Sequence, residues 1–576
     1  MLIDTSERVP NGSFEADICI VGTGPAGVVV ALELAKSGLR ICLLESGGQK
    51  PETGPADLNT GSVDSAHHYP AEIVRDGRRR QLGGSANLWN HQKYGGRGKM
   101  IRYVPLDEID FERRDWVPMS GWPFSRSDLA PFYRRAHRVC GIGPFDWSAG
   151  DWQSKSRTSQ LWQTKRIETV ISQFGTADVF LKDHLEKLEK TANVFIFAHA
   201  SLLSLNRNPR QPDAISTAEV VRSDGRRFKV KASKFVLAAG GLENARILLL
   251  NEATRNGAVG NRYDMVGRCF MDHPSITLGT LVPSSGAIYH QAAFYDQQEI
   301  DGQPIMGKLH LRQDVLRQEK LLNACAVLVP RLRSIRSNLP GLLKQIAIKV
   351  PRRLFRQAEQ SVSAHAGPGL PPSLHRRLLD DFYSECRCGW SSLSGLDRRF
   401  SEIAVRSLVE QSPDPANRIV LGDQLDALGQ PRCKVIWRWN EIDLLSIRRT
   451  QEIFRHELAL AGIGTFTPVP ESVGDAPRLF FSPHHFLGCT RMHENPRQGV
   501  VDADCRVHGL QNLYVVGGSV FPTGGYANPT LTIVALALRL SDHLRKDRST
   551  VSQVGSGAET KALTRIAFAR DDERRA

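Results

Sequence analysis

Residues 17–27 read DICIVGTGPAG, and this stretch decides the fold. The apolar run before Gly22 predicts a buried strand, and residues 28–38, VVVALELAKSG, predict a helix that ends at Gly38. Residues 39–46, LRICLLES, predict a second buried strand. A strand, a turn, a helix and a second strand in about 30 residues begin a parallel sheet. The N-terminal part of the chain is therefore predicted to be α/β.

The turn between this strand and this helix carries three glycines in the pattern GxGxxG, namely Gly22, Gly24 and Gly27. Gly22 allows the tight turn, Gly24 lets the main chain approach a pyrophosphate, and Gly27 lets the helix pack closely on the strand. Pro25 and Ala26 stand between these glycines and are further candidate cofactor contacts, and the helix that follows faces the phosphate with its free N–H groups and positive end. The pattern predicts a dinucleotide site rather than a glycine-rich turn without a ligand.

The second strand ends in an acidic residue, Glu45, which is followed by Ser46. An acid at this place accepts hydrogen bonds from the ribose hydroxyls of adenosine, and it repels a 2′-phosphate. We therefore do not expect NADP at this site. The strand–helix–strand unit alone leaves both NAD and FAD open.

The composition is that of a globular protein with a large core. The 576 residues are 41% hydrophobic and 24% charged, and their number suits two to four domains or one interleaved pair. The ten cysteines are scattered, and only Cys386 and Cys388 lie close together, so we expect reduced thiols and a cytoplasmic protein. The acidic, weakly apolar N-terminus predicts no secretory signal, and no run reaches the roughly 18 apolar residues of a membrane span. No metal site is expected.

Positive charge is concentrated in one region of the chain. The formal net charge is +14, and residues 331–400 hold 13 Lys and Arg against 5 Asp and Glu. A solubilising surface explains this charge most simply, while a lid, a docking face for an electron acceptor or weak membrane contact stay open. No nucleic-acid motif accompanies the charge, so a nucleic-acid partner is not expected.

The remaining pattern predicts further elements. A helix is expected from Ser125, with Asp128 completing a capping box, and others over 242–253 and 441–463. Strands are expected over 193–205, 228–241 and 416–440, antiparallel strands over 275–330, and strand, loop and helix after 512. Residues 50–110 look like irregular loops, and 331–380 like an insertion with an amphipathic candidate at 340–355.

Four further stretches distinguish FAD from NAD. They are RRRQLGGSANLWN (78–90), KFVLAAGGLENARILL (234–249), MVGRCFMDHP (265–274), and HHFLGCTRM (484–492) with the block 499–540 after it. With these stretches, in this order and over nearly its whole length, the chain resembles the glucose–methanol–choline (GMC) family of FAD oxidoreductases. The run EQSPDPANRIVL (410–421) and the variant GLENARILL look closest to the branch of pyranose 2-oxidase and bacterial sugar-acid dehydrogenases.

The resemblance implies a Rossmann-type FAD-binding domain interleaved with an α+β substrate domain built on an antiparallel sheet. The expected ranges are 14–100, 190–275 and 480–545 for FAD binding, 101–189 and 276–479 with the basic insert 331–400 for the substrate domain, and 546–576 for a mobile tail.

The resemblance also assigns cofactor contacts to loops at strand ends. Beyond the first motif and Glu45, these residues are Gly83, Gly84, Ser85, Asn87, Leu88, Trp89, Ala200, Ala239, Gly240, Gly518, Ser519, Asn528, Pro529 and Thr530. Pyranose oxidases bind flavin covalently through a histidine at the position of Leu88, and no cysteine lies in 78–97. We therefore expect FAD to be bound non-covalently.

Oxidation of an alcohol by FAD moves a hydride from carbon to flavin N5 and a proton from oxygen to a base. Histidine suits the base, and a second polar group should hold the oxygen. The resemblance places His485 and Asn528 in these two roles. Because an amide does not take the proton, His485 is left as the base. In another loop register His484 is the base.

A structural role for Asn528 also stays open, as do the roles of the other histidines. Asn528 is a good cap for a helix that begins at Pro529 and points its positive end at the flavin. His273, His493 and His508 are expected to be structural or surface residues.

The expected activity is oxidation of a primary or secondary alcohol in a sugar, sugar acid, glycoside or polyol. Oxygen, a quinone or a redox protein is the expected electron acceptor, and oxidase and dehydrogenase both remain open, as does the oligomeric state. A lyase or light-driven fatty-acid decarboxylase on the same frame is the alternative, followed by a non-catalytic flavoprotein. A disulfide reductase is disfavoured because the chain has no redox CxxxxC after the first motif and no second GxGxxG in mid-chain.

Overall fold

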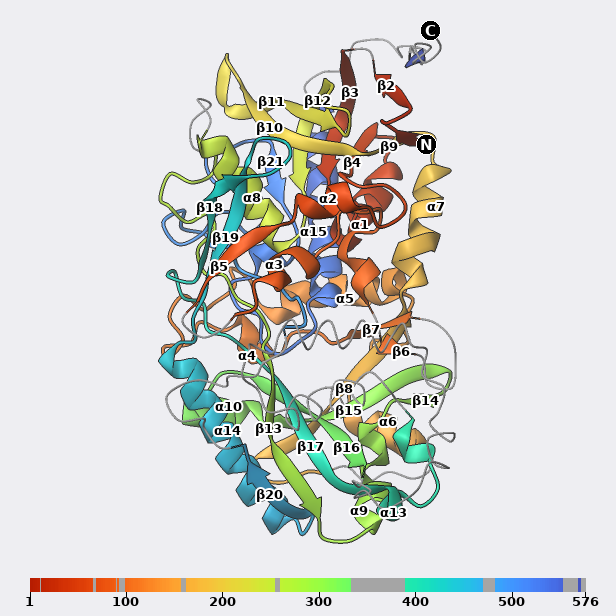
Figure 1. The fold of residues 1–576 in the computed structure, drawn as a ribbon, viewed down its shortest axis with the longest axis vertical. Coiled ribbons are helices and arrows are strands. Elements are labelled where there is room, and N and C mark those ends of the chain that lie inside the picture. Colours follow the sequence, from red (N-terminus) through yellow and green to blue (C-terminus); the bar gives the residue numbers. More distant parts are fainter. Residues whose placement is uncertain are drawn as a thin grey trace, which may run out of the picture.

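The computed structural model describes residues 1–10, 12–65, 69–89, 91–92, 99–156, 162–253, 259–332, 389–469, 482–552 and 568–570. Most of the basic insert, including the amphipathic candidate at 340–355 and both Cys386 and Cys388, lies outside these residues. Two large sheets occupy the two halves of the molecule in Figure 1.

The first sheet is mainly parallel. Its strands run in the order β1 (Leu2–Asp4), β9 (Val194–Ala198), β4 (Ile41–Leu44), β3 (Ser13–Val21), β12 (Arg227–Leu237), β11 (Gln211–Arg222) and β10 (Ala200–Asn208), with β21 (Leu513–Val515) beside the end of β12. β11 pairs antiparallel with both β12 and β10, and the other pairs of this sheet are parallel. Ile20 and Leu43 are fully buried, as expected for parallel strands covered on both faces. The prediction of a parallel sheet is confirmed.

Helices cover this sheet and pack against one another. α1 (Pro25–Ala35) packs on α15 (Thr530–Ser552), which also packs on α5 (Arg126–Cys140), and α8 (Gly241–Ala253) follows β12. α1 begins three residues before the predicted helix, since proline fits a first helical turn. The predicted capping box of α5 is present: Ser125 Oγ accepts from the main-chain N–H of Asp128, and Asp128 Oδ2 accepts from that of Ser125.

The second sheet is antiparallel throughout. Its strands run in the order β20 (Gly464–Pro468), β13 (Ser275–Pro283), β17 (Phe400–Val409), β16 (Ala324–Leu332), β15 (Gln303–Leu311), β8 (Ile167–Thr176), β7 (Lys99–Tyr103) and β6 (His91–Gln92), and β14 (Gln298–Ile300) pairs with β15. α14 (Glu441–Leu460) packs beside β20. The predicted fold class, a parallel α/β part interleaved with an antiparallel part, is confirmed.

Residues 50–110 hold more structure than predicted. They contain α2 (Thr53–Asp57), β5 (Gly61–Asp64), α3 (Glu72–Asp76), β6, β7 and the start of α4 (Glu108–Phe111). β5 pairs with β19 (Pro431–Ile436), which pairs with β18 (Arg418–Leu425). The sequence of β5, GSVD, has no strand pattern of its own, so its partner far along the chain determines its conformation.

Short elements complete the description. They are η1 (Gly84–Leu88), α6 (Ala149–Lys155), η2 (Val179–Asp183), α7 (His184–Glu189), α9 (Ala287–Gln291), η3 (Ala292–Tyr295), α10 (Gln313–Glu319), η5 (Trp390–Ser392), α13 (Leu396–Arg399) and η6 (Gly518–Val520). In the predicted tail, 546–552 belong to α15, and β22 (Phe568–Arg570) pairs with β2 (Arg8–Pro10). None of the described helices is long and apolar enough to span a bilayer.

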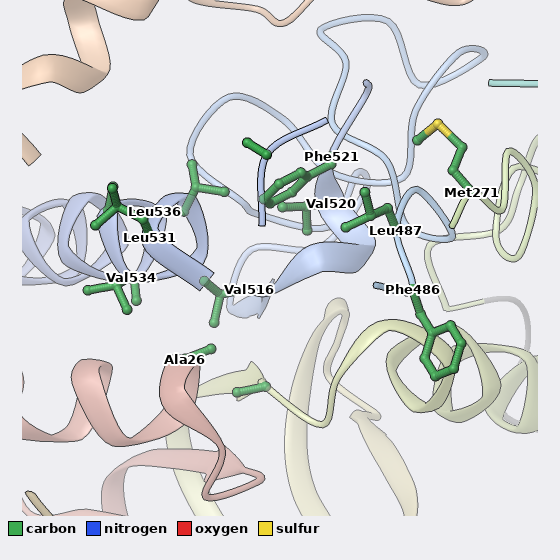
Figure 2. Packing of buried hydrophobic residues seen from close by; sticks show 14 of the residues in the cluster. Ala26, Met271, Phe486, Leu487, Val516, Val520, Phe521, Leu531, Val534 and Leu536 are labelled. Atoms are coloured by element: carbon green, nitrogen blue, oxygen red, sulfur yellow. The ribbon is translucent and has the colours of Figure 1, made fainter. Parts of the chain in front are cut away.

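An apolar cluster joins the loops at one end of the parallel sheet (Figure 2). Ala26 of α1 faces Val516, and the same cluster also holds Leu531 of α15, Phe521 and Leu487. All five side chains are buried. Each large apolar side chain contributes about 1.5–3 kcal/mol by its burial, so the first turns of α1 and α15 are firmly held at this end of the sheet.

Candidate active site

A cavity of about 350 Å³ lies between the two sheets. On one side it is lined by the residues that end β3, β4, β12 and β21, and on the other by residues of β7, β13 and β17. The carboxyl ends of parallel strands are where α/β sheets bind their ligands. The cavity therefore lies where the first motif predicts a dinucleotide.

Most of the predicted site residues line this cavity. They are Gly22, Gly24, Pro25, Ala26, Glu45, Ser46, Gly84, Ser85, Leu88, Trp89, Ala200, Ala239, Gly240, His485, Gly518, Asn528, Pro529 and Thr530. Four predicted residues lie behind the wall, namely Gly27, Gly83, Asn87 and Ser519. Asn87 donates to the carbonyls of Leu82 and Gly84, so it shapes the loop instead of facing the cavity.

The three glycines of the first motif meet different surroundings. A Cβ atom at Gly27 would lie 2.0 Å from the carbonyl oxygen of Gly22, and one at Gly22 would lie 2.5 Å from that of Ala238. A Cβ atom at Gly24 would have no atom within 4 Å. Gly24 precedes α1, no side chain caps this helix, and its first residues, Pro25 and Ala26, line the cavity. This arrangement fits a pyrophosphate.

Glu45 is held by its neighbours at the part of the cavity wall where the sequence predicts the adenosine ribose. One carboxylate oxygen accepts from the N–H and the hydroxyl of Thr23, at 3.2 and 2.7 Å, and the other from the N–H of Gly47 at 3.2 Å. Burial raises the pKa of Glu45 against these hydrogen bonds. The sequence pattern predicts the acid but not the part played by Thr23.

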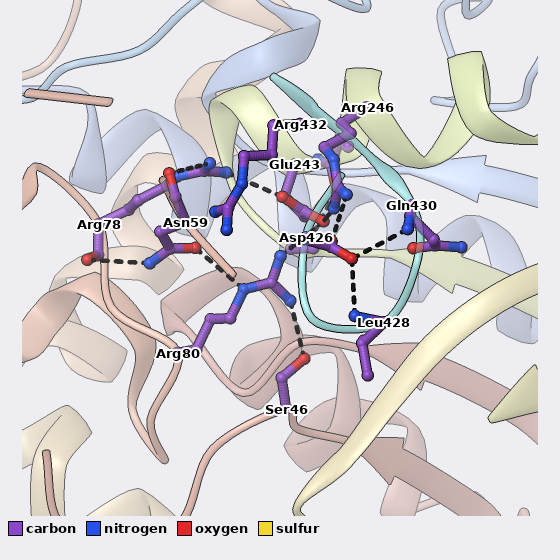
Figure 3. Close-up of polar contacts among 12 residues, drawn as sticks. Ser46, Asn59, Arg78, Arg80, Glu243, Arg246, Asp426, Leu428, Gln430 and Arg432 are labelled. Carbon is purple, nitrogen blue, oxygen red and sulfur yellow. Dashed lines mark hydrogen bonds and ion pairs between the residues drawn. The ribbon is translucent and has the colours of Figure 1, made fainter. Parts of the chain in front are cut away.

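A buried ionic network supports the same part of the cavity wall (Figure 3). Glu243 of α8 pairs with Arg78 at 2.8 Å, Arg80 at 2.7 Å and Arg246 at 3.0 Å. Burial alone would raise the pKa of Glu243, but the three guanidinium groups hold it well below its usual range. Arg80 also donates to Ser46 Oγ at 3.0 Å. The RRR stretch thus fixes the loop that lines the cavity, a role that its sequence does not show.

A second residue of α8, Asn244, joins the loops that follow β12 and β21. Its Oδ1 accepts from the N–H of Ala239 at 2.9 Å, and its Nδ2 donates to Ser519 Oγ at 3.0 Å. This contact explains why Ser519 faces away from the cavity. Asn244 stands in the quoted GLENARILL stretch, so its motif pointed to the region although not to this role.

His485 and Asn528 meet on the cavity wall. Nδ2 of Asn528 lies 3.4 Å from Nε2 of His485, and both residues line the cavity. Asn528 ends the loop before α15, so the helix N-terminus carries it to this place. Oδ1 of Asn528 is buried and has no hydrogen-bond partner among the described residues, which leaves an acceptor for a bound ligand.

The surroundings of His485 favour its neutral form. Burial lowers the pKa of His485 well below its usual value, and His273, His484, Arg102 and Lys308 lower it further. The ring is therefore unprotonated near neutral pH and keeps a lone pair for a proton. His484 also lines the cavity, with a positive φ of 65°.

His273, predicted to be structural or at the surface, lies against this site. It is 1% exposed, and its Nδ1 lies 3.0 Å from Nδ1 of His485. The neighbouring Asp272 is fully buried and accepts the main-chain N–H groups of both histidines. Both residues stand in the quoted MDHP stretch, which marked the segment without showing what it contacts.

Comparison with known proteins identifies the family of the chain. Residues 17–267 match the family model described as FAD binding domain, and residues 413–537 match the model described as GMC oxidoreductase. The 2-methyl-1,2-propanediol dehydrogenase of Mycolicibacterium austroafricanum is 22% identical over 92% of this chain and 95% of its own length. The fructose dehydrogenase large subunit of Gluconobacter japonicus is 23% identical over 93% of this chain and 99% of its own.

A solved structure shows the same fold. A variant of formate oxidase from Aspergillus oryzae RIB40 superposes with a TM-score of 0.51 at 17% identity, over 94% of this chain and all of that one. The two family models together cover the glycine turn, Glu45 and the segment with His485 and Asn528. The cofactor is FAD, and the chain belongs to the glucose–methanol–choline family of FAD-dependent oxidoreductases.

Proposed function

We propose that this protein oxidises a primary or secondary hydroxyl group of a sugar, a sugar acid or a polyol to a carbonyl group, with His485 as the base. The observation that carries the proposal is the contact between His485 and Asn528 on the wall of the FAD-binding cavity. The names of the relatives, a 2-methyl-1,2-propanediol dehydrogenase and a fructose dehydrogenase subunit, support a polyol or sugar as the substrate.

FAD, when bound, supplies the two-electron acceptor that takes the hydride from the alcohol carbon. Nε2 of His485 takes the hydroxyl proton, since its ring is neutral and faces the cavity. The N–H of Asn528 Nδ2 lies beside Nε2 and donates to the same substrate oxygen as negative charge develops there. A positioned base contributes about 10²- to 10⁴-fold to the rate.

The chain offers a non-covalent cradle for FAD. The turn at Gly22 and Gly24 with the first turn of α1 holds the pyrophosphate, and Glu45 holds the ribose. The first turn of α15, at Pro529 and Thr530, points N–H groups and its positive end into the cavity. Leu88 lines the cavity and carries no nucleophile, so acid precipitation should release all of the flavin into solution.

No second function is proposed. The alternative of a lipid-like substrate depends on the apolar faces of residues 341–350, which lie outside the described part of the chain. Oxygen, a quinone and a redox protein remain the proposed acceptors.

An anaerobic screen tests the proposed function. Sugars, sugar acids, polyols and aromatic alcohols are mixed in the dark with the FAD-loaded protein, and the visible flavin absorbance is followed. At least one hydroxyl compound should bleach the flavin and leave a carbonyl product in equal amount. Reduction by dithionite is the control for a competent flavin. Bleaching by dithionite but by none of the alcohols would contradict the proposal.

A further inference from the structure

The two histidines at the site share one hydrogen atom. Nδ1 of His273 and Nδ1 of His485 lie 3.0 Å apart, which is a hydrogen-bond distance. In such a contact between neutral rings, one nitrogen carries the hydrogen and the other accepts it. The tautomer of each ring therefore fixes the tautomer of the other.

Main-chain pairing holds both rings in place. Met271 and Leu487 form an antiparallel bridge, which sets His273 opposite His485. Asp272 Oδ1 accepts the N–H of His273 at 2.8 Å and that of His485 at 3.1 Å. Its Oδ2 accepts from Tyr69 Oη at 2.9 Å and from the hydroxyl of Ser482. Since one buried carboxylate anchors both main chains, the distance between the rings is fixed by the fold.

The other side of His485 decides which nitrogen carries the hydrogen. Nε2 of His485 lies 3.4 Å from Nδ2 of Asn528, which can only donate, so Nε2 accepts there and Nδ1 of His485 carries the hydrogen. Nδ1 of His273 then accepts, and the hydrogen of His273 is on its Nε2. Burial lowers the pKa of His273 to about 4, so its ring is neutral. Its Nε2 is buried against Gly524, where a Cβ atom would come within 2.7 Å of it, and has no hydrogen-bond partner among the described residues.

We infer that His273 is a positioning residue that holds His485 in the tautomer with its hydrogen on Nδ1, and so presents the lone pair of Nε2 to the substrate hydroxyl. This inference rests on the proposed function. In the opposite tautomer, Nε2–H of His485 would face the N–H groups of Asn528 Nδ2, 3.4 Å away, and no base would be available.

The contact between Nδ1 of His273 and Nδ1 of His485 also stabilises the protonated form of His485. When Nε2 takes the hydroxyl proton, both ring nitrogens of His485 carry hydrogens, and Nδ1–H keeps its acceptor at His273. Without that acceptor, a buried N–H of a cation would be left unsatisfied. The imidazolium would then form less readily, so the pKa of His485 would fall and the base would weaken.

Two polar replacements of similar shape separate this role from packing. In His273→Asn the amide oxygen takes the place of Nδ1 and accepts from His485, while the contact with Gly524 is lost. In His273→Gln the amide takes the place of Nε2 and keeps the contact with Gly524, while a methylene group faces His485. His137→Gln is the matched control, because His137 of α5 is also buried, bonds to the main-chain carbonyl of Gly143 and does not line the cavity.

The measurement is anaerobic flavin reduction in FAD-loaded protein, per bound flavin, from about pH 5 to pH 9. Other groups that face the two rings are His484, Arg102, Lys308 and Glu410, and no variant changes them. We expect His273→Asn and His137→Gln to stay within about 10-fold of the unaltered protein. We expect His273→Gln to lose about 10²-fold, with its acid limb moved to lower pH.

Equal losses in the Asn and Gln variants, or a faster Gln variant, would overturn the inference and leave the proposed function standing. An unaltered protein that no alcohol reduces would overturn both. Should His273→Gln bind no FAD, carbethoxylation of His485 by diethyl pyrocarbonate, followed by mass spectrometry, gives the same comparison without turnover. Diethyl pyrocarbonate attacks the unprotonated Nε2 of His485. We therefore expect slower labelling of His485 in His273→Gln than in His273→Asn, and equal labelling in the two variants would overturn the inference.

Discussion

Nδ2 of Asn528 lies 3.4 Å from Nε2 of His485, across 43 positions of sequence. The two residues come from different loops, one just before the bridge at Leu487 and one before α15, and they meet because the apolar cluster joins both loops. A base and a donor on one wall of a cavity are the arrangement that alcohol oxidation needs.

The amide of Asn528 should matter through its N–H group. Asn528→Ala is expected to slow flavin reduction by about 10²- to 10³-fold, the usual loss for one donor to a developing oxyanion. Asn528→Asp keeps the shape but puts an anion beside the forming alkoxide, so it should be at least as slow. Stopped-flow bleaching under nitrogen measures both. An Asp variant close to the unaltered rate would rule out the donor role.

The pH dependence of the reaction should report the lowered pKa of His485. Burial and the neighbouring cations favour its neutral form, and the base works only when it is neutral. The rate of flavin reduction should therefore stay constant as the pH falls through 6.5, the ordinary value for histidine, and should decrease only below it. Rates of flavin reduction at a saturating alcohol concentration, measured over the acid pH range, give the acid limb of this profile. An acid limb centred at or above that ordinary value would show that the surroundings do not act as described.

Two glycines of the first motif should respond differently to alanine. In Gly27→Ala the new Cβ would lie 2.0 Å from the Gly22 carbonyl oxygen, so the strand and helix must separate and Tm should fall. In Gly24→Ala the Cβ enters open space, so the protein should fold but bind FAD more weakly. Tm of the apoprotein and FAD titration separate the two effects. A loss of Tm in both variants with equal FAD affinity would contradict this assignment.

A buried ion pair should stabilise the half of the molecule that holds the antiparallel sheet. Arg114 and Glu410 are joined by two hydrogen bonds, at 2.9 and 2.6 Å, and both side chains are fully buried. Glu410→Gln leaves a buried guanidinium without its counter-charge, at a cost of about 3–5 kcal/mol in the free energy of unfolding.

The matched control is Glu112→Gln, which breaks an exposed pair with Arg317 and should change that free energy by less than about 1 kcal/mol. Urea unfolding of the two variants measures both changes. Equal effects would show that burial of the pair is not what matters.

Local sequence patterns predicted the β3–α1–β4 unit because each of its elements has its own periodicity and its own turn chemistry. The contact between His485 and Asn528 was expected only through the family resemblance. The contact between His273 and His485 could not be predicted, since the two residues are 212 positions apart and nothing in MDHP specifies its partner. β5 was missed for the same reason, because its pairing with β19 rather than its composition makes it a strand.

Comparison of the adjacent residues His484 and His485 tests most directly whether His485 is the base. Each is changed to glutamine in the FAD-loaded protein, and the rate of anaerobic flavin reduction by the best alcohol is measured. We predict that His485→Gln remains yellow and folded but loses about 10²- to 10⁴-fold, while His484→Gln loses far less. Near-normal reduction by His485→Gln, or the larger loss in His484→Gln, would contradict the account.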